Sequence, residues 1–356
     1  MSSKDQQTDL LSSGAGLGAA VALESGPDMG GEQQVRARGY WEGVWRRLRR
    51  DRLAIGSAIF IVLLFLTAFI GAPLAKRILR HGPNDIFIGS NAIDADLLPA
   101  GPMTRVEYFD PLTGEPKETL FILGASDELG RDEFLRILYG AQVSLEVAVL
   151  STIGVMIIGV LLGAIAGYYR GWIDTIISRV TEITMAFPAL LFIIALAATI
   201  GPRLDDVTLG IFGRGVITLF LVFTLFGWFY PCRIMRAQVL SIREKEYIEA
   251  AQMVGASDWR IVRSHVIPHL VAPMIVFSTL IVASYVLGEA GLSFLGLGIK
   301  SPTASWGNLL SEAPRFYTQQ PWLMVWPGLA VLLTTLAFNL LGDGLRDAFD
   351  PRSVGR

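Results

Sequence analysis

Six long apolar stretches constrain the fold of this 356-residue chain more than any other feature. A helix needs about 20 apolar residues to cross the hydrocarbon core of a bilayer, and backbone polar groups there must be satisfied within the chain. The stretches are too long for barrel strands, so the sequence predicts an all-α integral membrane protein with six transmembrane helices. The expected spans are residues 53–75, 141–168, 183–201, 214–232, 270–296 and 323–342.

Composition supports a membrane protein. Charged residues make up 17% of the chain, whereas soluble domains contain roughly 25%. The net charge of −2 provides no overall basic field for binding nucleic acid. The single cysteine, Cys232, excludes an internal disulfide and a site with several cysteine ligands. His265 and His269 have a metal-like spacing, but Pro268 between them spoils the geometry, so we predict no metal site.

The distribution of Lys and Arg predicts the orientation of the chain. The segment WRRLRRDR, in the basic juxtamembrane stretch 40–52, places the tail 1–39, which we expect to be disordered, in the cytoplasm. Six spans return the tail 343–356 to the same side. We therefore expect a multi-pass protein of the cell inner membrane with both termini cytoplasmic. Segment 76–140 is then extracytoplasmic, and we expect a loop insertion there with short strands at most.

A polar segment, EYIEAAQMVGASDWRIVRSHVIPHL, separates the fourth and fifth spans at residues 246–270. It is rich in helix-forming residues, and Gly255 in its middle favours a tight turn. Ser257 is expected to cap a second helix and Pro268 to stop it. The pattern predicts a helical hairpin that lies off the membrane.

The same pattern predicts which side chains this hairpin presents. We expect it to expose Glu249 and Trp259 and to bury the small residues Ala250 and Ala251. Two functions fit a hairpin of this kind. It is either a docking element for a cytoplasmic partner or an amphipathic hairpin that rests on lipid headgroups.

Four stretches of the chain resemble, in order and spacing, the permease subunits of ABC importers. Glu249-Ala250-Ala251, then Gly255, then the closing HVIP resemble the EAA loop of these subunits. Three others resemble blocks of the oligopeptide/dipeptide/nickel branch, in particular of its C-type permease subunit. They are LGASDELGRDEFLRILYGAQVSL (123–145), EAGLSFLGLGIKSPTASWGNLL (289–310) and LAFNLLGDGLRDAFDPR (336–352). The resemblance covers about 123–352 and leaves the N-terminal tail and the loop at 76–120 outside it.

The resemblance implies the type I permease fold of ABC importers, with a core at 141–342 and an ATPase-coupling hairpin at 243–268. The coupling residues that it implies are Glu249, Ala250, Ala251, Gly255, Ile267 and Pro268. It further implies half of a heterodimeric pathway, completed by a second homologous permease. Two cytoplasmic ABC ATPases would use ATP and Mg²⁺ to drive it, and an extracytoplasmic solute-binding protein would deliver peptides. Nickel or another small solute is the alternative substrate.

The chain itself contains no G-x-x-x-x-G-K-[ST] phosphate-binding loop. We therefore expect a transport subunit that is not an enzyme and binds no cofactor of its own. An ion-coupled secondary transporter, the more remote alternative, would need carboxylates deep within the spans, and mid-span charges are scarce. An intramembrane enzyme would need a nucleophile–base pair or a metal site, and a pure membrane anchor would not need the polar hairpin.

Three further groups of residues attract attention. Gly159, Gly163 and Gly167 recur every four residues in the second span, a spacing that favours close helix packing within the bundle or across a permease dimer. Glu289, at the end of the fifth span, is interpreted as a structural hydrogen-bonding residue, and a place in the transport pathway is the alternative. Asp127 and Arg131 in SDELGRD predict a capped turn with an internal ion pair. A gate or a contact with the binding protein is the alternative for that turn.

Overall fold

The computed structural model describes residues 40–109, 114–199, 203–204 and 215–350. The prediction for the tail 1–39 lies outside the described residues. The predicted tail 343–356 is helical as far as Phe349, and its residues 351–356 lie outside the described residues. The described helices and strands all lie within residues 40–350.

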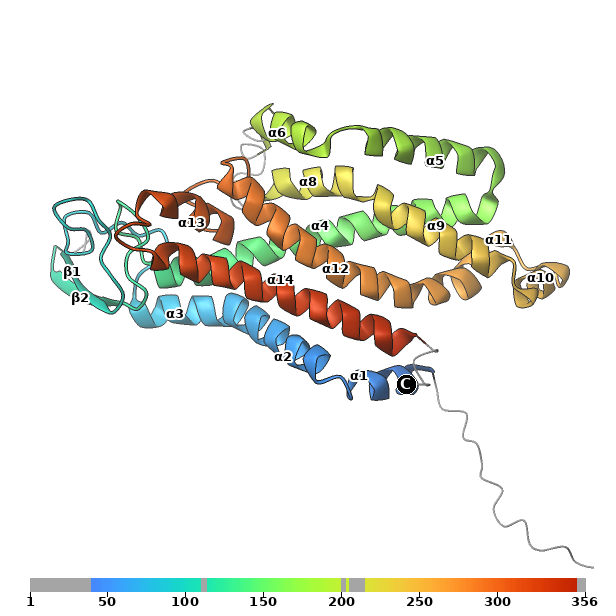
Figure 1. Ribbon diagram of the computed structural model, residues 1–356, viewed down its shortest axis with the longest axis horizontal. Coiled ribbons are helices and arrows are strands. Elements are labelled where there is room, and N and C mark those ends of the chain that lie inside the picture. Colours follow the sequence, from blue (N-terminus) through green and yellow to red (C-terminus); the bar gives the residue numbers. More distant parts are fainter. Residues whose placement is uncertain (1–39, 110–113, 200–202, 205–214, 351–356) are drawn as a thin grey trace, which may run out of the picture. The chain divides into compact units, whose positions relative to one another are not determined.

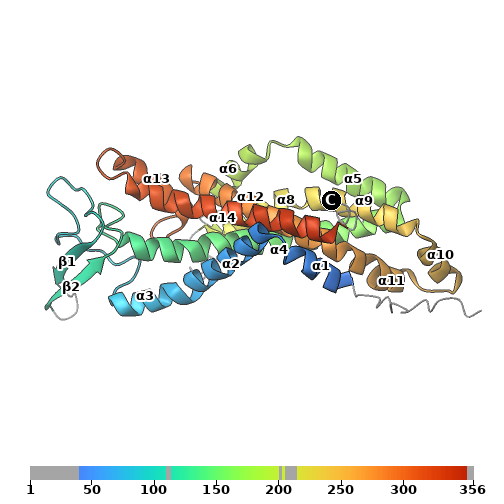
Figure 2. The ribbon, with the colours of Figure 1, turned by 60° about the horizontal axis from the view of Figure 1, so that its bottom comes forward.

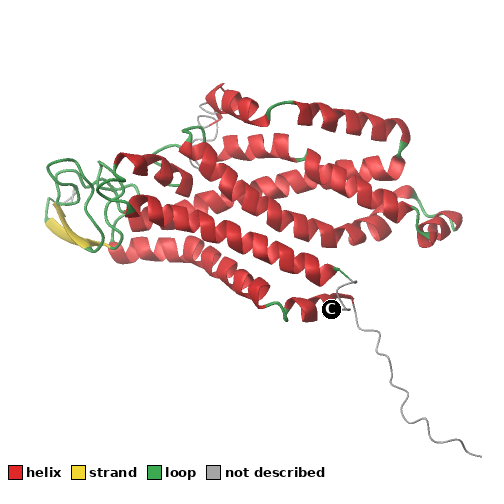
Figure 3. Cartoon of the chain, viewed as in Figure 1, coloured by secondary structure: helices red, strands yellow, loops and turns green. Residues whose placement is uncertain are grey.

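Four continuous helices of the described chain are long and apolar enough to cross a membrane (Figures 1 and 3). The first combines α2 (Arg52–Leu66), a π-helical turn (Thr67–Gly71) and α3 (Ala72–Leu79). The second is α4 (Glu133–Tyr169), and the fourth is α14 (Trp322–Phe349). The third runs over Asp258–Phe294 and combines α11 (Asp258–Ile261), a π-helical turn (Val262–Val266) and α12 (Ile267–Phe294).

Two further pairs of helices are bent in the middle. The first pair is α5 (Gly171–Ala186) with α6 (Ala189–Thr199), and the second is α8 (Val216–Gly227) with α9 (Phe229–Arg243), which is bent by 40°. If each bent pair is one span, the described residues supply six spans. The all-helical fold predicted from the apolar stretches is therefore confirmed.

The bounds of several spans differ from the prediction for identifiable reasons. α4 begins eight residues early, because the Asp132 carboxylate accepts hydrogen bonds from the backbone N–H groups of Phe134 and Leu135 and caps the helix there. The predicted third span began too late, at residue 183, because it missed α5. The break between α5 and α6 falls at Phe187, whose backbone is extended (φ −78°, ψ 137°), as expected for a residue before proline.

The long helices pack around α4, which contacts α8, α9 and α12, while α14 packs against α12 and α2 (Figures 1 and 2). The largest apolar cluster includes Leu145 of α4, Val286 of α12 and Phe338 of α14. A short N-terminal helix, α1 (Tyr40–Leu48), lies beside the end of α14, where Trp41 meets Phe349 edge to face.

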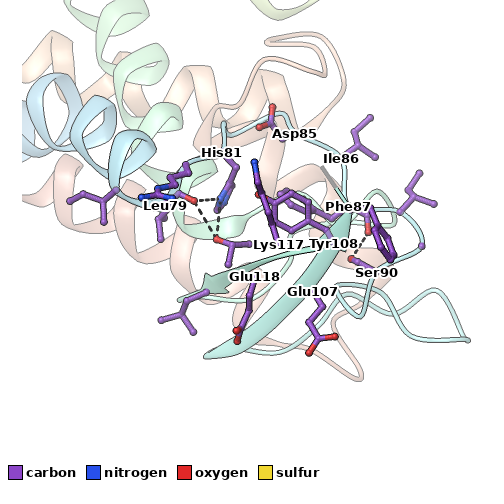
Figure 4. A pocket seen from close by; sticks show the side chains of 17 residues that line it. Leu79, His81, Asp85, Ile86, Phe87, Ser90, Glu107, Tyr108, Lys117 and Glu118 are labelled. Atoms are coloured by element: carbon purple, nitrogen blue, oxygen red, sulfur yellow. Dashed lines mark hydrogen bonds between the residues drawn. The ribbon is translucent and has the colours of Figure 1, made fainter. Parts of the chain in front are cut away.

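The segment between the first two long helices contains two short antiparallel strands, β1 (Thr104–Phe109) and β2 (Pro116–Phe121), in agreement with the prediction for 76–140. Phe87, Val106 and Phe121 form its small apolar core. Buried His81 joins this core to the start of α4, since its Nε2 lies 2.8 Å from the Asp132 carboxylate. Figure 4 shows His81, Phe87 and Tyr108 along a groove with a cavity of about 1120 Å³.

The strands and the helix α10 (Glu246–Met253) lie at opposite ends of the described bundle (Figure 1). We call these the sheet end and the hairpin end. The short helix α13 (Trp306–Glu312), followed by a 3₁₀ turn (Ala313–Arg315), lies at the sheet end.

Candidate functional site

The hairpin, defined here as residues 246–261, consists of α10, a turn and α11. Gly255 adopts a left-handed backbone conformation (φ +83°), which residues with a side chain rarely adopt. A Cβ atom at this position would meet no other atom within 4 Å. The turn therefore needs glycine for its backbone conformation rather than for space.

A buried apolar root attaches the hairpin to the bundle. Ile248 and Ile261 are fully buried and belong to one cluster with Met235 and Val239 of α9 and Leu270 of α12. Burying a side chain of this size stabilises the fold by roughly 1.5–3 kcal/mol. The hairpin is therefore packed firmly against the helices from which it emerges.

Polar contacts reinforce this root. The hydroxyl of Tyr168, at the end of α4, donates a 2.8 Å hydrogen bond to Asp258 at the start of α11. Arg243, at the end of α9, donates to the backbone carbonyl oxygen of Tyr168 and lies 5.6 Å from its ring centre. Tyr247 stacks on His269. Displacing the hairpin would thus displace α4, α9 and α12 together.

The far side of the hairpin presents apolar side chains to the surroundings. Met253 is 83% exposed, Val254 89% and Trp259 69%. Glu249 is also exposed, so the predicted exposure of Glu249 and Trp259 is confirmed. An exposed apolar cluster on an otherwise polar segment is typical of an interaction surface.

Three local predictions for this segment were wrong. Ala250 is exposed and Ala251 only half-buried, because Ile248 turns toward the bundle in their place. Ser257 occupies the N-cap position, but its side chain makes no capping hydrogen bond. Pro268 does not stop the helix. It comes just after the π-helical turn Val262–Val266, where the regular i→i−4 hydrogen-bond pattern is already interrupted, and the helix continues from Asp258 to Phe294.

The glycines of the second span lie against α9. Cβ atoms built on Gly159, Gly163 and Gly167 would come within 2.6–2.8 Å of Pro231, Cys232 and Val239 respectively. Contacts this short do not occur in real structures, so only glycine permits this approach of α4 to α9. The structure therefore places the stripe inside the chain's own bundle.

A cluster of buried charges lies at the sheet end, and we call Asp127, Arg131, Arg136 and Glu312 the sheet-end charge cluster. Arg131 pairs with Asp127, as predicted from SDELGRD. Arg136 Nη2 lies 3.3 Å from Glu312 and 3.2 Å from the side-chain oxygen of Asn308, both on α13. Burial raises the pKa of Glu312, while Arg136 and Arg131 act in the opposite direction. The cluster joins the start of α4 to α13.

A second polar layer joins the same elements deeper in the bundle. Glu289 of α12 is fully buried and accepts 2.7 Å hydrogen bonds from Ser144 of α4 and from Ser293. The hydroxyl of Ser144 accepts in turn from the backbone N–H of Trp306 on α13. This arrangement agrees with the hydrogen-bonding interpretation of Glu289 made from the sequence.

Comparison with known proteins assigns the chain to a family. Residues 159–354 match the family described as binding-protein-dependent transport system inner membrane component, and residues 39–99 match the N-terminal TM domain of oligopeptide transport permease C. The chain is 36% identical over 321 residues to the dipeptide transport system permease protein DppC of Alkalihalophilus pseudofirmus, a match that covers 90% of this chain and 93% of that relative. The chain belongs to this family of ABC importer permeases.

A second relative agrees with this assignment. The permease is 36% identical over 312 residues to the glutathione transport system permease protein GsiD of Pectobacterium atrosepticum, covering 88% of this chain and 91% of the relative. Among solved structures, the inward-facing MetNI methionine ABC transporter gives a TM-score of 0.46 at 17% identity over 59% of this chain. The family and the apolar helices make the permease a multi-pass inner-membrane protein.

The permease family extends further along the chain than its motifs indicated. The match at 39–99 includes the first span and the start of the following loop, so the expectation that the whole of 76–120 lies outside the resemblance is wrong. Sequence reasoning also missed Arg136 and Glu312. The one available signal was the charged pair Glu133 and Arg136, three residues apart just before the predicted second span.

Proposed function

We propose that this permease forms half of a heterodimeric transmembrane pathway through which an ATP-driven importer takes up peptides. A second, homologous permease supplies the other half. Two cytoplasmic ATPases bind ATP and Mg²⁺, and one of them docks on the hairpin. An extracytoplasmic binding protein delivers the substrate. In this arrangement the hairpin end and both termini face the cytoplasm, and the sheet end faces outward.

The proposal rests on one observation, which is that the hairpin combines an exposed apolar face with a buried root. It leaves Met253, Val254 and Trp259 exposed while its root is fully buried against α4, α9 and α12. An ATPase groove that accepts the exposed face would move three spans as one body. Coupling requires an element whose position both sites influence, and the hairpin meets that requirement.

Peptides are the proposed substrate because the relatives named above are a dipeptide permease and a glutathione permease, each 36% identical to this chain. The external binding protein is expected to set most of the selectivity. Competition of labelled dipeptide uptake by unlabelled dipeptides, glutathione and nickel salts tests this assignment. Competition by nickel alone would replace peptides with the alternative substrate.

The docking role is tested with the complete transporter in proteoliposomes. Gly255→Trp is expected to distort the turn, and Glu249→Lys to reverse a charge on the exposed face. Both variants should insert into the membrane and should abolish substrate-stimulated ATP hydrolysis and uptake. Glu118→Lys, an exposed acid at the sheet end, is the matched control and should retain both activities. Normal coupled uptake in both hairpin variants would contradict the docking role.

A further inference from the structure

Two buried side chains at the sheet end carry polar atoms without a hydrogen bond to any described residue. They are Glu133 Oε1 and the Nε and Nη1 atoms of Arg136. Glu133 is 1% exposed and Arg136 is fully buried. Buried polar atoms in native proteins are nearly always hydrogen-bonded, so such exceptions require an explanation.

Two guanidinium groups lie among three carboxyl groups around these atoms. Arg131 and Arg136 face three carboxylates, those of Asp127, Glu133 and Glu312. Asp127 pairs with Arg131, and Glu312 lies near both guanidinium groups. Glu133, although buried, has no ion pair within the described residues. The two guanidinium groups can therefore pair with these three carboxyl groups in more than one arrangement.

The second arrangement is within reach of Arg136. Glu133 and Arg136 are three residues apart in the first turns of α4, and side chains at this spacing lie on the same helix face. Arg136 reaches across to Asn308 and Glu312 of α13 with Nη2, while its Nε makes no hydrogen bond. Turning toward Glu133 would give Glu133 Oε1 and the Arg136 guanidinium group a hydrogen bond, and it would give up the contacts to α13 and the 3.7 Å contact between Nη1 and Asp127.

We propose that Arg136 is a positioning residue for transport that exchanges partners between α13 and its own helix. Paired with Glu312 and Asn308, it holds α13 against the start of α4 and keeps the outer side of the pathway closed. Paired with Glu133, it releases α13 and favours the outward-open state. This inference rests on the proposed function as a transport pathway.

The deeper contacts determine how α13 moves. The Glu289–Ser144–Trp306 layer contains no Arg136 atom and holds the start of α13 in both arrangements. The end of α13, which carries Glu312, is the part that Arg136 releases. Just beyond it, exposed Arg315 lies 3.7 Å from exposed Glu128, which belongs to the segment before α4. These two positions report the separation of the same elements without contacting Arg136 directly.

The test uses disulfide cross-linking in the complete transporter. Glu128→Cys and Arg315→Cys are introduced together in a Cys232→Ser background, and the rate of cross-linking is measured in membranes. Glu312→Gln should lower the rate about tenfold, the effect of losing one charge-assisted hydrogen bond to α13. Glu133→Gln should raise it, because the competing partner is weakened. Glu118→Gln, in the external strands, should leave the rate unchanged.

A purely structural role for the cluster predicts a different pattern. Glu133 would then be a bystander, and its replacement would not increase cross-linking. Changes in the same direction for Glu133→Gln and Glu312→Gln, or no change in either, would overturn the partner exchange.

Uptake supplies the second measurement. Glu133→Gln should lower the maximal rate of uptake while leaving the KM for the substrate-loaded binding protein within twofold, because fewer transporters open outward. An unchanged maximal rate beside an active wild type would overturn the link to transport. If the wild type itself shows no ATP-driven uptake, the proposed function fails instead, whereas the cross-linking rates still decide whether Arg136 exchanges partners.

Discussion

At the hairpin end, apolar side chains lie in the open and the root beneath them is an apolar cluster. At the sheet end the arrangement is reversed, since ionised side chains such as Arg131 and Arg136 are buried between helices. An exposed apolar surface stabilises nothing until a partner covers it. A buried ion pair holds its elements together but becomes costly when one member is lost. This contrast is the reason why partner binding is the proposed role of the hairpin end and internal positioning the proposed role of the sheet end.

The largest effect on stability is expected from breaking the buried charges. Arg131→Met removes the close ion pair of buried Asp127 and leaves it only the longer, 3.7 Å contact with Arg136, so it should destabilise the protein by about 3 kcal/mol. Thermal unfolding of the purified permease in detergent measures the loss. The double variant Arg131→Met with Asp127→Asn should recover most of it, because the charge is gone while the side-chain oxygen can still accept from the backbone N–H groups of Leu129 and Arg131. If the Arg131→Met variant were as stable as the wild type, the buried charges would not hold the sheet end together. The proposed difference between the two ends would then be wrong.

A smaller effect separates the root of the hairpin from its exposed side. Ile248→Ala removes fully buried methyl and methylene groups and should cost about 2–4 kcal/mol. Val254→Ser changes an exposed side chain and should alter stability by less than about 0.5 kcal/mol. Under the proposed docking role, Val254→Ser should nevertheless reduce substrate-stimulated ATP hydrolysis in the complete transporter. Equal losses of stability in the two variants would contradict the division of the hairpin into root and surface.

The smallest effect is expected from an exposed ion pair at the sheet end. Arg105 on β1 and Glu118 on β2 are diagonal neighbours whose Nη1 and Oε1 atoms lie 3.4 Å apart, with more than half of each side chain exposed. Such pairs contribute about 0–1 kcal/mol. Glu118→Gln should therefore shift the unfolding temperature little, in contrast to Arg131→Met at the same end. A large shift of the unfolding temperature in Glu118→Gln would contradict the idea that burial makes the Arg131 pair more important for stability than the exposed Arg105–Glu118 pair.

The periodic and compositional features of this chain could be predicted without coordinates. Apolar stretches of about 20 residues require spanning helices, and Gly255 in a polar helix-forming segment indicates a turn. The pair Asp127–Arg131 was predictable for the same reason, because its members are four residues apart and meet locally. The stripe at Gly159, Gly163 and Gly167 indicated close packing, but not that α9 is the helix that packs there.

Sequence alone determined that this protein is built from membrane-spanning helices and where its polar hairpin lies, because both follow from local composition and spacing. Only the tertiary structure decided that α11 continues into α12 through Pro268, that Ile248 rather than Ala250 faces the bundle, and that Arg136 meets Glu312 across 176 residues. Those outcomes depend on which segments come together in space. No local pattern in the chain carries that information.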